Sequence, residues 1–183
     1  MNNEITINGV TYIRKDKCNC PFMNNKKNEN ENNDRKYDFT GITKNHNGHI
    51  LHQIIALKDF GDVKRGDIGG WIEVEDNLSH KDNAWVYDDA MVFGNALVCD
   101  NTRVYGNALV YGNARVCGNA WVSENARVHG DALVCEDAWV YGHARVCGNA
   151  LVYDNAWVYG YAMVCGDAKV CGDAEVRVYD VNC

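Results

Sequence analysis

Two histidines within a run of six-residue repeats have the chemistry of a general base. His129 takes an outward position on an expected strand, and His143 stands at a corner where most repeats carry Asn. Imidazole is the usual proton acceptor near neutral pH because its ordinary pKa is about 6.5. The sequence identifies no carboxylate or nucleophile beside either histidine, so we predict no catalytic residue.

A second group of residues has the ligand types of a zinc site. Cys18 and Cys20 form a Cys-x-Cys motif, and His46, His49 and His52 follow it along the chain. This cysteine spacing is shorter than the common structural zinc pattern, and no second cysteine pair accompanies it. We favour a loop with incidental thiols, and we predict neither a metal site nor a cofactor.

The secondary-structure elements that position these side chains can be predicted from a repeat in the sequence. Residues 83–178 are sixteen uninterrupted copies of the phrase Asn/Asp-Ala-x-Val-x-Gly/Asp. Ala and Val alternate with outward residues, as on a strand with one buried face. Gly, Asn and Asp tolerate the positive φ of a sharp corner. One short strand and one corner per repeat predict an all-β fold, a three-sided parallel β-helix with eighteen residues per coil.

Two domains are expected. Residues 65–183 form the parallel β-helix, and residues 1–64 form a small β-rich cap with a hairpin at residues 5–13 and further strands from Tyr37 and from His49. An Asn/Lys-rich stretch at about 19–36 has few apolar residues and is expected to be a mobile loop. A β-helix end exposes an open core, which favours a cap; the alternative is a partner-binding head.

The hexads resemble the left-handed parallel β-helix of hexapeptide-repeat proteins, a class best known from bacterial acyltransferases. The segments at 56–63, 69–72 and 77–79 resemble the lead-in of hexapeptide-repeat proteins common in phage and prophage genomes. The resemblance implies the left-handed coil and a phage-related origin. It also implies that enzymes of this class use a His base at a cleft between subunits, with a loop extruded over the substrate. The sixteen hexads carry no such loop.

Outward residues eighteen apart should stack in columns, and one face of the prism is rich in aromatic residues. We predict an interaction face there, most often used for self-association, because Trp, Tyr and Arg dominate binding hot spots. The alternative is a ladder of stacked rings that only shields the strands. The predicted face consists of Trp85, Tyr87, Arg103, Tyr105, Trp121, Trp139, Tyr141, Trp157 and Tyr159.

Acidic residues gather along one corner of the expected prism. Such a row could mimic a phosphate track and bind a basic groove on another protein. The alternative, which we favour, is ordinary solvated turn residues, because Asp suits corners for local reasons. The row consists of Asp82, Asp100, Glu136, Asp137, Asp154 and Asp173.

Charge is unevenly distributed along the chain. The formal net charge is −7; residues 1–64 carry 10 Lys/Arg and 8 Asp/Glu, and residues 65–183 carry 8 and 17. An acidic prism makes nucleic acid an unlikely partner. The sequence shows no apolar run long enough for a membrane span and no signal peptide, so we expect a cytoplasmic protein with reduced cysteines.

We therefore interpret the chain as a non-catalytic β-helical binding protein, self-associating as a dimer or trimer. A specific hypothesis follows from the phage resemblance, namely inhibition of a bacterial host protein such as a CRISPR nuclease. The alternative is an acyltransferase-like enzyme with a site between subunits, which would need a pocket of convergent polar groups.

Overall fold

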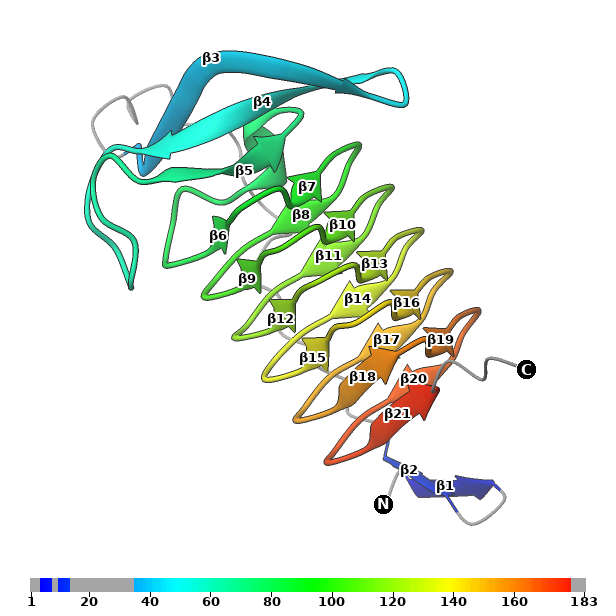
Figure 1. The fold of residues 1–183 in the computed structure, drawn as a ribbon. Helices are drawn as coiled ribbons and strands as arrows, with labels where there is room; N and C mark the ends of the chain where they lie inside the picture. Colours follow the sequence, from blue (N-terminus) through cyan, green and yellow to red (C-terminus); the bar gives the residue numbers. More distant parts are fainter. Residues whose placement is uncertain (1–3, 8–9, 14–34, 179–183) are drawn as a thin grey trace.

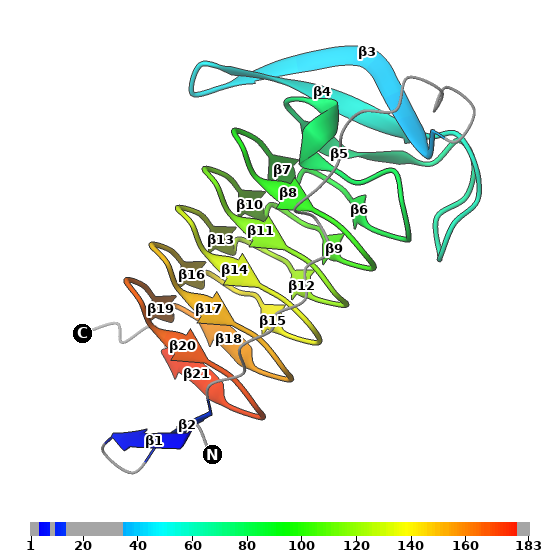
Figure 2. The ribbon, with the colours of Figure 1, turned by 180° about the vertical axis from the view of Figure 1, so that it is seen from behind.

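The computed structural model describes residues 4–7, 10–13 and 35–178. Its repeats form a parallel β-solenoid with three flat sides, in which successive coils stack in chain order (Figures 1 and 2). Each coil contributes one short strand to each side, and strands eighteen residues apart pair in register, as Val122 does with Val140. The predicted all-β, three-sided parallel β-helix is confirmed.

The three sides are three hydrogen-bonded sheets. The first face contains β6 (Trp85–Val86), β9 (Arg103–Val104), β12 (Trp121–Val122), β15 (Trp139–Val140), β18 (Trp157–Gly160) and β21 (Glu175–Val178). The second face contains β5 (Ile68–Ile72), β7 (Met91–Val92), β10 (Leu109–Val110), β13 (Arg127–Val128), β16 (Arg145–Val146) and β19 (Met163–Val164). The third face contains β8 (Leu97–Val98), β11 (Arg115–Val116), β14 (Leu133–Val134), β17 (Leu151–Val152) and β20 (Lys169–Val170).

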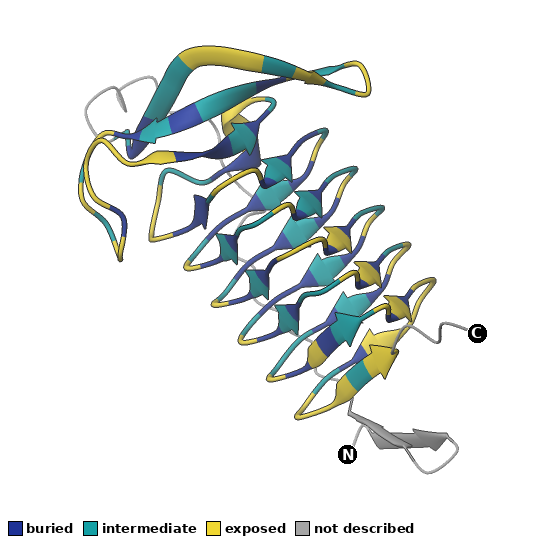
Figure 3. Cartoon of the chain, in the orientation of Figure 1, coloured by how far each residue is buried: buried dark blue, intermediate teal, exposed yellow. Residues whose placement is uncertain are grey.

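The interior is a column of Ala and Val side chains. From Ala84 to Ala162 the inward residue of each repeat is almost completely buried (Figure 3). Ala leaves room for the opposite sides of a narrow prism, and Val fills the pleat. The corners need a left-handed backbone, which Gly118 adopts at φ 72° and Asp100 at φ 61°. The hexad thus specifies both the core and the turns.

An antiparallel hairpin extends the second face at the start of the solenoid. β3 (Tyr37–His46) pairs with β4 (His49–Ala56), β4 pairs antiparallel with β5, and β5 pairs parallel with β7. Figure 1 shows this hairpin lying across the first coil. Trp85 is buried there, with its ring edge-on to Tyr37 and Phe60 at centroid distances of 6.1 and 5.3 Å.

A short 3-10 helix, η1 (Glu75–Asn77), interrupts the first coil before the regular repeats begin. Asn77 is buried there and makes four hydrogen bonds. Its Oδ1 accepts from the backbone N–H groups of Glu73 and Val74, at 3.1 and 2.9 Å. Its Nδ2 donates to the carbonyl oxygens of Gly94 and Ala96, at 3.0 and 2.8 Å. This side chain therefore adds to the reduced backbone pairing with the next coil, which here consists of the Leu78–Val98 bridge and the Ser79 N–H bond to the Val98 carbonyl oxygen at 2.9 Å.

Only some of the elements predicted for the N-terminal region lie within the described residues. β1 (Glu4–Ile7) and β2 (Val10–Ile13) pair antiparallel, as expected for a hairpin. Most of the stretch at about 19–36 lies outside the described residues, as do Cys18 and Cys20. Its last residue, Lys36, was wrongly assigned to a mobile loop, because it is buried and its Nζ donates to the Ala84 carbonyl oxygen at 2.7 Å. Burial lowers the pKa of Lys36 to about 7.

Candidate interaction surfaces

Three tryptophans of the first face form a continuous stack, which we call the aromatic ladder. Trp121 and Trp139 are parallel within 4° at a centroid distance of 4.7 Å, and Trp139 and Trp157 lie 5.3 Å apart. The in-register pairing of β12, β15 and β18 sets this spacing, because parallel strands lie about 4.8 Å apart. Beside them, Tyr141 stacks on Tyr159 at 4.9 Å.

The part of the predicted interaction face that lies next to the β3–β4 hairpin is covered or held by other residues. Trp85 is 1% exposed beneath the β3–β4 hairpin, so its assignment to an exposed face was wrong. The alternation of inward and outward residues correctly placed the Trp85 side chain outside the prism, but the β3–β4 hairpin covers this side chain. Asp62 holds the next two members, accepting hydrogen bonds from the Tyr87 hydroxyl at 2.9 Å and the Arg103 guanidinium at 3.2 Å. Burial, then the bond to Asp62, raises the pKa of Tyr87 to about 12.

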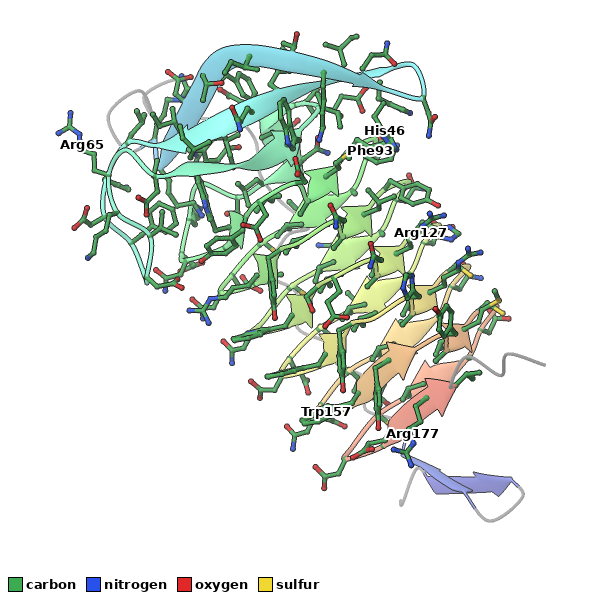
Figure 4. The ribbon with its side chains drawn as sticks, viewed as in Figure 1. His46, Arg65, Phe93, Arg127, Trp157 and Arg177 are labelled. Atoms are coloured by element: carbon green, nitrogen blue, oxygen red, sulfur yellow. The ribbon has the colours of Figure 1, made fainter. Side chains whose placement is uncertain are left out.

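The ladder itself presents ring edges to solvent. Stacking covers the flat faces of Trp139 on both sides, and Arg103 lies over Trp121 at 5.1 Å, with Tyr105 edge-on to the same ring. Exposure is greatest at the last member, Trp157, at 39% (Figure 4). In the adjacent column of the same strand, the Tyr159 hydroxyl donates to Glu175 of the next coil at 2.9 Å. Ring stacking and an accessible surface therefore coexist on this face.

The acidic row serves the prism internally. Asp100 accepts the Gly118 N–H at 2.9 Å, Glu136 accepts that of Asp154 at 3.1 Å, and Asp154 accepts that of Gly172 at 3.0 Å. Asp137 and Asp173 accept side-chain hydrogen bonds from Asn119 and Asn155 of the preceding coil, and Asp82 has a φ of 54°. These contacts favour the turn-residue interpretation of the row.

Asp100 allows a test of that interpretation. Asp100→Asn is expected to leave the unfolding midpoint nearly unchanged, because the amide oxygen still accepts the Gly118 N–H and Asn tolerates positive φ. Asp100→Ala should destabilise the protein by about 1–2 kcal/mol, since it loses the acceptor and keeps the left-handed φ. Urea denaturation of both variants measures the difference. Equal losses would show that charge, rather than the hydrogen bond, matters at this corner.

Three cysteines at outward positions of the repeat are buried. Cys99, Cys117 and Cys135 form a column on the third face, covered by Leu97, Leu133 and Tyr153. The alternation gives the correct side of the strand, but neighbouring long side chains close over these short ones. They form a small satellite core, and the third face offers little accessible thiol there.

The two candidate general bases each stack on a tyrosine ring. His129 stacks on Tyr111 at 4.8 Å and His143 stacks on Tyr161 at 4.8 Å; in the part of the chain that the structure describes, neither contacts a carboxylate. Burial, then the charges of Arg145 and Arg127, lowers the pKa of His129. Near the hairpin tip, the His49 Nδ1 lies 2.9 Å from Glu73 Oε1, a pair that the sequence analysis missed because 24 residues separate its members.

Among the described residues, the fold brings no zinc-binding group of side chains together. Within residues 35–178, no group of three His, Cys, Asp or Glu side chains could hold a metal ion. His46 and His49 contact Phe93 instead, with ring centroids 5.5 and 4.8 Å apart (Figure 4). His52 contacts Phe39 at 4.8 Å. His46 and His49 therefore help to attach the hairpin to the second face, whereas His52 and Phe39 both belong to the hairpin.

The second face also has a shallow depression that the sequence analysis did not single out. It measures about 400 Å³ and is lined by Asn125, Arg127, His143, Arg145, Tyr161 and Met163. The available signal was the eighteen-residue spacing of the two arginines. None of the described segments forms a helix with the length and hydropathy that a membrane span requires.

The stacked hexads and the three parallel sheets define a hexapeptide-repeat β-helix protein. Its repeats match the model of the YdcK β-solenoid repeat at residues 102–118, 114–130 and 144–160. A relative from Escherichia coli strain K12, named "Uncharacterized acetyltransferase YdcK", is 46% identical over 55 residues. That match covers 30% of this chain and spans 17% of the length of the relative.

Proposed function

We propose that this is a non-catalytic binding protein that associates with further copies of itself through the aromatic ladder. The observation that supports this most is the row of indole edges from Trp121 to Trp157 on an otherwise acidic prism. Trp and Tyr bury a large area at little cost in side-chain entropy, so they dominate interfaces. Because Trp157 is the most exposed member, the contact should centre on that end.

Light scattering under reducing conditions tests self-association. We expect the mass of a dimer or trimer for the wild type and of a monomer for Trp157→Ala. Met163→Ala is the matched control, since Met163 is 58% exposed on the second face of the neighbouring repeat. A monomeric wild type, or equal dissociation in both variants, would overturn self-association through the ladder.

We further propose that the partner of this protein is a host protein. The acidic balance of residues 65–183 and the phage-like lead-in at 56–79 support an inhibitor of a defence protein such as a CRISPR nuclease. Adding the purified protein to a nuclease cleavage reaction tests this directly. Unchanged cleavage at a large molar excess would remove that nuclease from consideration.

The second candidate is acyl transfer, favoured by the similarity over 55 residues to a protein named as an acetyltransferase. His143, at the depression on the second face, would be the residue to test. The assay is release of free thiol from an acetyl thioester with a panel of amine acceptors. Turnover that disappears in His143→Ala would favour an enzyme over a binding protein.

A further inference from the structure

Arg127 and Arg145 form a pair of stacked like charges on the second face. β13 and β16 pair in register, which places the two residues directly opposite each other, and both side chains are exposed. Among the residues that the structure describes, neither guanidinium has a salt bridge or a hydrogen bond to a carboxylate. Arg103 on the first face differs, because its guanidinium lies 3.2 Å from Asp62.

Such a pair needs a counter-charge. Like charges on directly opposed strand positions are destabilising, so two unpaired guanidiniums in register weaken the solenoid when nothing lies between them. Residues 65–183 carry 17 Asp/Glu against 8 Lys/Arg, yet among the described residues none of these carboxylates forms an ion pair with Arg127 or Arg145. Figure 4 shows Arg127 on the side of the prism away from Trp157. An anion bridging both arginines would remove the repulsion.

The depression beside the pair gives that anion a place. Its remaining lining residues supply an amide at Asn125, an imidazole at His143 and a phenol at Tyr161, with Met163 as an apolar contact. A volume of about 400 Å³ lies at the small end of ligand sites, which run from roughly 300 to 1,000 Å³. The His143 and Tyr161 rings stack parallel within 6° and form one side of the depression.

We infer that Arg127 and Arg145 bind the phosphate group of a small phosphorylated molecule, whose remaining atoms occupy the depression lined by Asn125, His143 and Tyr161. Guanidinium groups donate two parallel hydrogen bonds to a phosphate, and a dianion neutralises both charges. A carboxylate carries a single charge and would leave one arginine uncompensated. This site lies on a different face from the aromatic ladder and goes beyond the proposed self-association.

Titration of the intact protein with each probe at fixed ionic strength tests the inference. NMR of the His129 ring is the readout of the titration. The probes are inorganic phosphate, glycerol 3-phosphate and acetate. We expect saturable binding of both phosphates and at least about tenfold weaker binding of acetate. The pKa of His129, which burial and then the charges of Arg145 and Arg127 lower, should rise when a bound phosphate offsets those two charges. Tighter binding of glycerol 3-phosphate than of inorganic phosphate would show that the depression binds the part of the ligand beyond its phosphate group.

Variants separate the pair from general basic charge. Arg127→Gln and Arg145→Gln should each weaken phosphate binding by about tenfold or more. Arg115→Gln is the matched control, because Arg115 is an outward arginine of the third face with Leu97 and Leu133 as register partners. Equal weakening by Arg115→Gln, or acetate binding as tightly as phosphate, would overturn the inference. The comparison of phosphate with acetate needs only the wild type, so it stands even where a variant folds poorly.

Discussion

Asn77→Asp is expected to lower the free energy of unfolding by at least about 3 kcal/mol. The substitution keeps the shape of the side chain but removes both amide donors to Gly94 and Ala96. It also brings a carboxylate against their carbonyl oxygens in a site that is 1% exposed. Because backbone pairing between the first and second coils is reduced here to the Leu78–Val98 bridge, and the Asn77 side chain supplements it, the start of the solenoid should unfold first.

The control is the same substitution one coil later. Asn95 occupies the same position in the repeat, but it is exposed and donates a single hydrogen bond to Asn113. Asn95→Asp should cost about 1 kcal/mol or less. Urea denaturation followed by circular dichroism measures both variants. Similar losses at the two positions would contradict the role assigned to the buried Asn77 amide.

Trp139→Ala is expected to destabilise the protein by about 2–3 kcal/mol, because Trp139 is the middle member of the ladder and loses two stacked neighbours. Trp157→Ala loses one stacked tryptophan from a more exposed position, so about half that cost is expected. Both effects are read as shifts in the urea midpoint at a concentration where the oligomeric state is known.

This comparison separates the two roles of the aromatic face. If the rings serve the fold alone, Trp139→Ala lowers stability and the solution mass of both variants matches the wild type. If they also form an interface, Trp157→Ala changes the mass more than it changes stability. Equal destabilisation by the two variants would contradict the additive stacking on which the estimate rests.

Much of the solenoid could be predicted from the repeat. The alternation of Ala and Val fixes which side of each strand is buried, and Gly, Asn and Asp fix where the corners fall. The eighteen-residue period also places Trp121, Trp139 and Trp157 in one column. These are local consequences of strand geometry, since a coil pairs only with its neighbours.

The candidate surfaces could be predicted less well, because exposure depends on what else covers a face. Trp85 occupies the same repeat position as Trp139, yet the β3–β4 hairpin buries it against Tyr37. Cys117 is covered by side chains from neighbouring positions of its own face. At the acidic corner, Asp100, Glu136 and Asp154 accept hydrogen bonds from backbone N–H groups of the next coil, which only the stacking of coils brings near.

The sequence by itself therefore determined the hexad, the inward and outward sides of every repeat, and the columns. Tertiary structure alone decided which outward positions remain accessible, how Asn77 supplements the backbone pairing of the first coil, and where Arg127 and Arg145 meet a depression. The physical reason is that strand alternation is a property of six consecutive residues. Burial, buried hydrogen bonds and the environment of a charge depend on segments that are distant in the chain.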